Sequence, residues 1–427
     1  MVPQQLIEKY KQQRKVTTDS RKVSEGDIYF ALKGPNFDGN KFAQSALQDG
    51  ASFAVVDDSS LSGDRMIHVD DVLTALQDLA KLIRSEFTFP VIGITGSNGK
   101  TTTKELMRDV LQKKLKAHAT KGNLNNHIGV PITILNTPLE TELAIIEMGA
   151  NHVGEIASLC EISQPDYGLI TNIGKAHLEG FGGIEGVKKG KSELYKSVAK
   201  QGKTIFVNGN DDTLLELSEG QDRIIYGDST DNLFEIELDE SFPTVSFTWK
   251  THDSSFPEIS TNLTGGYNLP NISAALAVGI HFGVDASMIN EAISEYTPDN
   301  NRSQLKTTDK DNLLILDAYN ANPTSMEMAL RNLSGMRAQR KFFVIGDMLE
   351  VGESSKEEHQ NIVDLAIDLE LDGILVGKEF SKISSPYPTF TDADDAIAYL
   401  KERELYSTTI LLKGSRGIQL EKVEPIL

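Results

Sequence analysis

The stretch that constrains the fold most strongly is Val91-Ile-Gly-Ile-Thr-Gly-Ser-Asn-Gly-Lys-Thr-Thr102. A short apolar run that favours a β-strand leads into a glycine-rich turn, and the apolar residues after the turn recur at helical spacing. This order of elements forms a cradle for phosphate, because the backbone N–H groups of the turn and the helix N-terminus both attract an anion. We therefore predict that this turn binds ATP or GTP.

The side chains of this turn have separate expected roles. Gly96 and Gly99 permit the backbone to turn inward, Lys100 can reach the outer phosphates, and the hydroxyl of Thr101 is placed to bind Mg²⁺. Ile94 stands where the general nucleotide-binding pattern has glycine, so the loop is a variant. A glycine-rich turn without a ligand is disfavoured, because strand, turn, Lys-Thr pair and helix follow in the order that phosphate binding needs. The residues expected to bind the nucleotide here are Thr95, Gly96, Ser97, Asn98, Gly99, Lys100, Thr101 and Thr102.

The bulk properties limit the class of protein. A chain of 427 residues is too long for one compact core, so two or three domains are expected. The net charge of −20 argues against a nucleic-acid-binding surface. Neither a signal-peptide core nor a run of membrane-spanning length is present, and the single cysteine, Cys160, fits a reducing compartment. We therefore expect a cytoplasmic protein with no membrane span.

Strands and helices alternate along the chain, which predicts an α/β fold with parallel sheets. We expect three domains: a small α/β domain over 1–87, a central doubly wound sheet domain over 88–298, and a Rossmann-like α/β domain over 299–427. Between 234 and 249 the apolar residues alternate with period two, which predicts antiparallel strands added to the central sheet. The other expected strands are 53–56, 66–69, 143–148, 167–171, 204–207, 224–226, 313–316, 342–345, 373–376 and 409–412.

Polar residues follow several of these strands directly, among them Glu147, Asp317 and Lys413. Open α/β sheets bind ligands in the crevice beyond the carboxyl ends of their strands. Glu147 can therefore hold the Mg²⁺ of a bound nucleotide, and this role is favoured over a surface glutamate because an apolar strand delivers it to that edge.

Other candidates stay open on local sequence. His177 alone is more typical of a structural histidine, and Lys191 of a solvated lysine in a basic turn. The segment Asp317-Ala-Tyr-Asn-Ala-Asn-Pro323 suits either ligand binding, with Tyr319 as a stacking face, or a plain Asn-Pro turn. Arg21 either binds an anion or belongs to a helix cap.

Together these motifs resemble the Mur ligases, the ATP-dependent amide-forming enzymes of peptidoglycan precursor assembly. The matching segments are 95–102, Glu147, 176–178, 191–195 and 317–323, and the resemblance extends from Asp19 to Arg416. Segments 122–131, 147–155, 177–182 and 346–352 are similar to the branch of the family that joins D-Ala-D-Ala to UDP-N-acetylmuramoyl-tripeptide (UDP-MurNAc-tripeptide). The Asp-Asn-Pro-Arg signature of the diaminopimelate-adding branch is not found in the chain.

The resemblance implies a catalytic set made of Lys100, Glu147, His177, Lys191, Arg302 and Asp317. Thr101 and Glu147 would hold one Mg²⁺, and Glu147, His177 and a carbamylated Lys191 would hold a second. Asn268 and Asn271 would contact the base of ATP, although Tyr267 stands where the family often has histidine. Arg302 and Asp317 would reach the ATP phosphates. Tyr319 and Asn320 would lie near the adenosine.

The resemblance also implies how the substrates are held. Ser20 and Arg21 would bind the UDP group, and Asn125 and Asn126 would line the peptide side of the cleft. The groups expected near the dipeptide are Lys413, Ser415 and Arg416. The implied protein is a monomer that forms an acyl phosphate and closes its C-terminal domain over ATP. The alternatives are another amino-acid-adding Mur ligase, a folylpolyglutamate-synthase-like ligase and a non-catalytic ATP-binding cell-wall scaffold. The third peptide residue, diaminopimelate or lysine, stays open.

Overall fold

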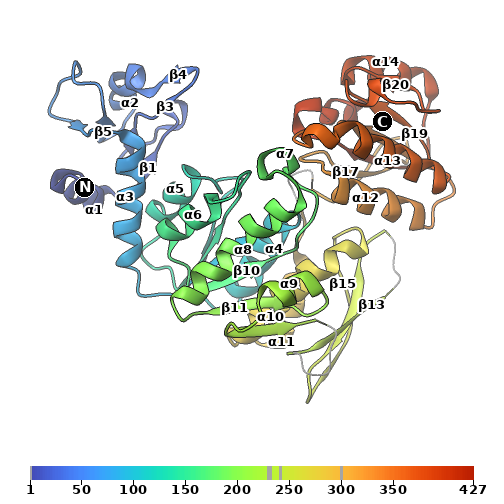
Figure 1. Cartoon of the computed structure of the whole chain (residues 1–427), viewed down its shortest axis with the longest axis horizontal. Helices are drawn as coiled ribbons and strands as arrows, with labels where there is room; N and C mark the ends of the chain where they lie inside the picture. The colour runs from blue at the N-terminus through green and yellow to red at the C-terminus, as the bar shows by residue number, and fades with distance from the viewer. Residues whose placement is uncertain (1, 228–232, 240–242, 299–301) are drawn as a thin grey trace.

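The computed structural model describes residues 2–227, 233–239, 243–298 and 302–427. The chain forms three α/β units in sequence order, each built on its own main sheet (Figure 1). The predicted α/β class with parallel sheets is confirmed. In the described part of the chain, no helix is both long enough and apolar enough to cross a membrane.

The first unit has a four-stranded parallel sheet in the order β1-β2-β5-β6. Its elements are α1 (Gln4–Gln13), β1 (Val16–Thr17), β2 (Ile28–Phe30), β3 (Lys33–Gly34), β4 (Phe37–Asp38), α2 (Ala43–Gln48), β5 (Phe53–Val56), β6 (Met66–His68) and α3 (Val72–Ser85), with 3₁₀ turns at Ser20–Lys22 and Gly39–Phe42. Asp71 caps α3 by accepting from the Thr74 N–H at 2.7 Å. The apolar face of α3, including Leu76 and Leu79, is buried, which places this helix between the first and second units.

The central unit has a six-stranded parallel sheet in the order β12-β11-β10-β7-β9-β8. Its strands are β7 (Val91–Thr95), β8 (Ala117–Ala119), β9 (Leu143–Glu147), β10 (Tyr167–Ile170), β11 (Thr204–Asn208) and β12 (Arg223–Tyr226). Its helices are α4 (Lys100–Gln112), α5 (Gly129–Leu135), α6 (Glu155–Ser163), α7 (Leu178–Phe181), α8 (Ile184–Lys200), α9 (Asp212–Leu217), α10 (Leu269–His281) and α11 (Ala286–Glu295), with a 3₁₀ turn at Gly266–Asn268. Because β8 and β9 lie on one side of β7 and β10 on the other, the strand order reverses beside the glycine-rich turn, where α/β sheets bind ligands.

The prediction of antiparallel strands added to the central sheet is wrong. The antiparallel strands β13 (Glu235–Asp239), β14 (Ser246–Lys250) and β15 (Ser255–Ser260) exist, but they pair only with one another in the described residues, while 240–242 lie outside them. Phe247 and Trp249 of this small sheet are buried in the cluster that also contains Ile289 of α11. Period-two alternation therefore identified the buried face of these strands, whereas it carries no information about which edge is paired.

The third unit has a mixed six-stranded sheet in the order β16-β17-β21-β18-β19-β20, in which only β16 is antiparallel to its neighbour among the described strands. Its strands are β16 (Gln304–Thr307), β17 (Leu313–Asp317), β18 (Lys341–Gly346), β19 (Asp372–Val376), β20 (Thr389–Phe390) and β21 (Thr409–Lys413). Its helices are α12 (Pro323–Gly335), α13 (Ser355–Asp368) and α14 (Ala393–Arg403), with 3₁₀ turns at Gly352–Ser354, Phe380–Lys382, Arg416–Ile418, Leu420–Lys422 and Glu424–Ile426. The boundary expected between 298 and 299 borders 299–301, which lie outside the described residues.

Candidate functional site

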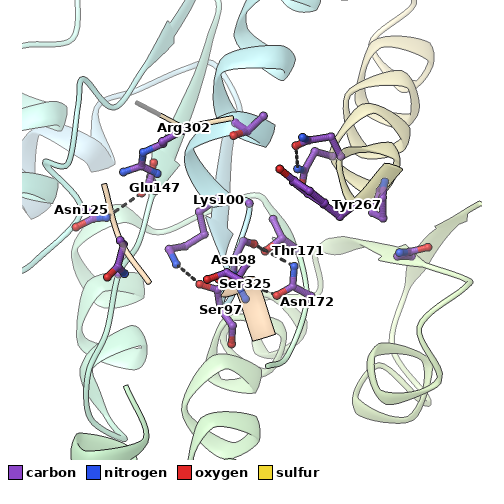
Figure 2. Close-up of a pocket in the computed structure, with 18 of the residues that line it drawn as sticks. Ser97, Asn98, Lys100, Asn125, Glu147, Thr171, Asn172, Tyr267, Arg302 and Ser325 are labelled. Carbon is purple, nitrogen blue, oxygen red and sulfur yellow. Dashed lines mark hydrogen bonds between the residues drawn. The ribbon is translucent and has the colours of Figure 1, made fainter. Parts of the chain in front are cut away.

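A cleft of about 2020 Å³ lies at the carboxyl ends of β7, β9 and β10, and residues of all three units line it. Figure 2 shows its centre, where Lys100, Glu147 and Arg302 lie close together above the glycine-rich turn. The predicted residues that line the cleft are Ser97, Asn98, Gly99, Lys100, Thr102, Asn125, Asn126, Glu147, His177, Asn268, Asn271, Arg302, Asp317, Tyr319, Asn320 and Lys413. Those outside its lining are Ser20, Arg21, Thr95, Gly96, Thr101, Lys191, Ser415 and Arg416.

The glycine-rich turn is tightly enclosed, which explains its two glycines. Gly96 has φ +145°, and a Cβ there would lie 1.9 Å from the hydroxyl oxygen of Thr171. Gly99 has φ +79°, and a Cβ there would lie 2.4 Å from the side-chain oxygen of Asn271. Any other residue would strain the backbone and collide with a neighbouring element. The turn is therefore held in one shape by the loops around it.

Asn172, which follows β10, supports the same turn. Its backbone carbonyl accepts from the Ser97 N–H, and its side-chain oxygen accepts from the Asn98 N–H, both at 3.0 Å. The Asn172 side-chain amide also donates to the Asn98 carbonyl at 3.1 Å, as Figure 2 shows. Two neighbouring strand ends thus fix the loop before any ligand arrives.

Lys100 folds back over the turn. Its Nζ donates to the carbonyls of Gly96 at 2.6 Å and Ser97 at 3.2 Å. The pKa of Lys100 is lowered to about 8, chiefly because burial disfavours the ammonium; the charge of Glu147 opposes this shift and the charge of Arg302 adds to it. The ammonium can exchange these hydrogen bonds to backbone carbonyls for hydrogen bonds to the oxygens of an anion.

Glu147 ends β9 and is 1% exposed. Its carboxylate accepts from the Thr101 hydroxyl at 3.2 and 3.1 Å and from the Asn125 amide at 2.8 Å. A hydroxyl and a carboxylate side by side at the start of a phosphate-loop helix are hard oxygen donors of the kind that Mg²⁺ binds. These two residues therefore fit one magnesium ion.

Sequence reasoning missed Lys104, which lies beside Glu147. Its Nζ is 3.3 Å from the Glu147 carboxylate, and both side chains are 1% exposed. Lys104 follows Lys100 by four residues on α4, so it lies one helical turn further along the same face. That spacing was the available signal.

The two residues that the resemblance adds as metal ligands have different surroundings. His177 has a left-handed φ of +52°, and its Nδ1 lies against the carboxylate of Glu350 of the third unit. Lys191 is buried, and its Nζ donates to the Ala150 carbonyl at 3.1 Å. The solvated surface position that its local sequence suggests is therefore wrong, because α8 turns this lysine inward, with its Nζ 5.1 Å from the centre of the Phe181 ring.

Burial lowers the pKa of Lys191 well below its ordinary value, and the charge of Lys100 adds to the shift against the opposing charges of Glu155 and Glu193. A neutral amine is the form that combines with CO₂, so carbamylation is chemically compatible with this position. No group of three His, Cys, Asp or Glu side chains that could hold a metal ion occurs among the described residues.

Asn268 and Asn271 form a small buried network beside the turn. The Asn271 amide donates to the Asn268 side-chain oxygen at 2.8 Å, and the Asn271 side-chain oxygen accepts from the Thr103 hydroxyl at 3.0 Å. Tyr267 is hydrogen-bonded to the hydroxyl of Ser303 at 3.0 Å, and burial raises its pKa. The two asparagines are therefore fixed by protein contacts at the edge of the cleft.

Residues of the third unit complete the opposite wall. The Arg302 guanidinium stacks 3.8 Å from the centre of the Tyr319 ring, and its Nε has no hydrogen-bond partner among the described residues. Lys413 is buried and donates to the Asp317 carboxylate at 2.6 Å and to the Asn320 carbonyl at 3.3 Å. The wall thus presents an arginine stacked on a tyrosine and a carboxylate paired with a buried lysine.

The remaining predicted substrate residues are dispersed. Arg21 is 85% exposed and pairs with Asp19 through two hydrogen bonds, which lowers the pKa of Asp19 to about 2. The Asn126 side-chain oxygen accepts from backbone N–H groups at the start of α5. The Ser415 hydroxyl accepts from the Leu349 N–H at 2.9 Å.

The second and third units meet beside the turn. The Asn322 amide at the start of α12 donates to the side-chain oxygen of Asn98 at 2.7 Å. The Lys175 N–H donates to the hydroxyl of Thr324 at 3.0 Å, and its Nζ pairs with Glu358 at 2.6 Å. Sequence reasoning missed these contacts, because they join residues far apart in the chain.

Three family models match successive parts of the chain: "Mur ligase family, catalytic domain" over 14–84, "Mur ligase middle domain" over 94–279 and "Mur ligase, glutamate ligase domain" over 301–416. The chain belongs to the Mur ligase family, and the resemblance predicted from sequence is confirmed.

Among its relatives are proteins named UDP-N-acetylmuramoyl-tripeptide--D-alanyl-D-alanine ligase. Those of Bacillus subtilis and Escherichia coli are both 34% identical, and each match covers 96% of this chain and 92% of the relative. The chain is also similar to solved structures of MurF from Acinetobacter baumannii (TM-score 0.87, 30% identity, 99% and 98% of the two chains) and of MurF ligase from Thermotoga maritima in complex with ADP (TM-score 0.85, 28% identity, 97% of each chain). A folylpolyglutamate synthase from Thermotoga maritima, at 13% identity and TM-score 0.60, shares the fold alone.

Proposed function

We propose that this protein is an ATP-dependent ligase that joins D-Ala-D-Ala to the terminal carboxylate of UDP-MurNAc-tripeptide. The observation that carries the proposal is the cleft in which Lys100 and Glu147 of the central unit face Arg302 of the third unit. The names of the full-length relatives supply the substrate class.

The reaction needs an activated carboxylate, because a free carboxylate is a poor electrophile. The tripeptide carboxylate attacks the γ-phosphorus of ATP, the bond to the β-γ bridging oxygen breaks, and ADP leaves. The amine of D-Ala-D-Ala then attacks the acyl carbon of the resulting acyl phosphate and loses a proton. The tetrahedral intermediate collapses, phosphate leaves and the amide remains. Water must be excluded meanwhile, since it would hydrolyse the acyl phosphate.

The cations of the cleft have roles that follow from their positions. Lys100 would exchange the carbonyls of its own loop for the β- and γ-phosphates. Arg302, held against Tyr319, would stabilise the charge on the transferring phosphoryl group from the opposite wall. Asn268 and Asn271 would contact the base, with Tyr319 and Asn320 near the adenosine. Closure of the third unit would bring these groups together.

Magnesium would be held by Thr101 and Glu147, and a second ion by Glu147, His177 and carbamylated Lys191. When bound, these ions would neutralise negative charge on the phosphates. The support is the contact between Thr101 and Glu147 and the burial that lowers the pKa of Lys191. On the substrate side, we keep Ser20, Arg21, Asn125, Asn126, Lys413, Ser415 and Arg416 as proposed contacts.

The test is ADP release from the purified protein given ATP, Mg²⁺ and UDP-MurNAc-tripeptide, with and without D-Ala-D-Ala. Release that depends on both substrates, with a pentapeptide product by mass, is the expected result. If release instead requires a single amino acid and a shorter UDP-peptide, the substrate assignment is wrong. ATP binding without release under any condition would favour a non-catalytic scaffold. Parallel assays with diaminopimelate- and lysine-containing tripeptides identify the third residue.

We also propose that the protein is a cytoplasmic monomer. The single cysteine is buried, as suits a reducing compartment. Light scattering during size-exclusion chromatography should give a mass near 46.9 kDa. A mass of twice that value would contradict the monomer.

A further inference from the structure

Lys104 is a buried charge that no step above uses. It is 1% exposed and does not line the cleft. Its Nζ lies 3.3 Å from the Glu147 carboxylate, 3.4 Å from the Gly122 carbonyl and 3.9 Å from the Glu105 carboxylate. An ammonium so enclosed cannot turn away to solvent, so it remains beside Glu147 whatever the cleft contains.

The carboxylate of Glu147 is fully engaged by protein groups. Both oxygens accept from the Thr101 hydroxyl, one also accepts from Asn125, and the other faces Lys104. The ammonium of Lys104 lies beside this carboxylate, and the charge of Glu147 also acts on Lys100, whose pKa it raises against the effect of burial. Without nucleotide, the base of the cleft is thus neutral or positive.

We propose that Lys104 is a positioning residue that makes divalent-cation binding at Glu147 depend on the nucleotide. Its charge offsets that of the carboxylate, so a divalent cation gains little from Glu147 alone. The phosphates of a bound nucleotide add the negative charge that the cation then requires. The inference rests on the proposed function in one respect, the role of Glu147 as a metal ligand.

The consequence concerns the order in which metal and nucleotide bind. Metal without nucleotide would otherwise occupy Glu147 and pull Thr101 away from it, disturbing the start of the phosphate-loop helix. With Lys104 in place, metal and nucleotide arrive together, and the loop keeps its shape until they do. The contacts that Lys104 makes with Gly122 also tie Glu147 to the loop that precedes α5.

The test is titration of the nucleotide-free protein with Mn²⁺, followed by the electron paramagnetic resonance signal of the free ion. The variant Lys104→Gln removes the charge but keeps a donor for Glu147 and Gly122. We expect it to bind Mn²⁺ about tenfold more tightly than wild type. With ADP present, the difference should fall to about threefold or less, because the phosphates then dominate the local charge.

Three controls fix the interpretation. Lys104→Arg keeps the charge and should bind like wild type. Lys113→Gln removes a charge just beyond the far end of the same helix, where Lys113 pairs with Glu291 and Glu295, and should also bind like wild type. Adding Glu147→Gln to Lys104→Gln should abolish the gain, which assigns the gain to Glu147.

Equal Mn²⁺ affinity for wild type and Lys104→Gln would overturn the inference, as would a gain that survives Glu147→Gln. If Lys104→Gln fails to fold by circular dichroism, wild type alone still decides, because tight Mn²⁺ binding without nucleotide contradicts the proposal. The titration contains no peptide substrate. Failure of the ligase assay with Mn²⁺ coupling intact would therefore reject the proposed function and leave this inference standing.

Discussion

The two walls of the cleft differ in how they are held. On the central unit, the glycine-rich turn and Glu147 are enclosed by neighbouring strand ends, and the backbone of the turn and the Glu147 carboxylate are bonded within that unit. On the third unit, Arg302 is held by stacking on Tyr319 and leaves Nε without a partner in the described part of the chain. One wall is organised in advance by its own fold, and the other depends on how the two units meet.

Specific polar contacts join the two walls. Asn322 reaches Asn98, Glu350 reaches His177, and Lys175 reaches α12 and α13. His177 and Glu350 both have left-handed φ angles, at +52° and +65°, which non-glycine residues adopt at a cost. In Figure 1 the short helix α7 projects from the central unit toward the third. Substitutions on the two walls should therefore have different kinetic signatures.

The largest effect is expected for a substitution on the wall that the central unit forms. Lys100→Ala removes the only lysine of the turn and should lower kcat by about 10³-fold, because a preorganised charge at the transferring phosphate is lost. Steady-state ADP release measures this, with Lys116→Ala at an exposed position as the control. Retention of more than about a tenth of wild-type kcat would contradict the assigned role of Lys100.

Arg302→Ala tests the wall that the third unit forms. Turnover should fall by about 10²-fold, while binding of the UDP-sugar substrate, measured by calorimetry without ATP, should stay unchanged. The matched control is Arg331→Ala, since Arg331 is 58% exposed on α12 and pairs with Glu327 within its own helix. Equal losses of turnover and UDP-sugar binding would mean that Arg302 supports the whole cleft, and the contrast between the walls would fail.

Asn322→Ser tests a contact between the walls. Asn322 caps α12 by accepting from the Ser325 N–H at 2.9 Å and also donates to Asn98. Serine keeps the cap but is too short for Asn98, so kcat/KM for ATP should fall about fivefold, the cost of one hydrogen bond of about 1 kcal/mol. Thermal unfolding checks that the cap survives. A lowered Tm with unchanged kcat/KM would reduce Asn322 to a structural cap.

The two walls also differ in how far sequence could predict them. Strands 53–56, 143–147 and 409–413 were predictable because apolar runs delimited by polar residues report burial directly. Glu147 was predictable for the same reason, since the end of a strand fixes its place on the sheet edge. The Mur ligase resemblance, and not local sequence, singled out His177 and Lys191.

The remaining features depend on pairing that sequence periodicity does not encode. The separate sheet of β13–β15 depends on which edges meet, and Lys104 on which helix face turns toward Glu147. Asn98 and Asn322 are 224 positions apart, so only the arrangement of two units brings them together. Contact between distant segments, rather than local propensity, therefore determines how the third unit completes the cleft.

The smallest effect is expected at Cys160, a buried residue of the central unit that lies outside the lining of the cleft. It is 3% exposed on α6, next to Met148, and burial raises the pKa of its thiol to about 12. The thiolate is the reactive form, so the folded protein should not react with a disulfide reagent at pH 8, whereas the denatured chain should react at once. Because the unfolded thiol ionises first, the free energy of unfolding should decline as pH rises from about 9 toward 12. Absorbance of the released thiol measures the first effect and urea unfolding the second.

If the wall is organised in advance, adding nucleotide should leave the protection of Cys160 unchanged. A thiol that becomes reactive only when ATP binds would show that this wall moves as well.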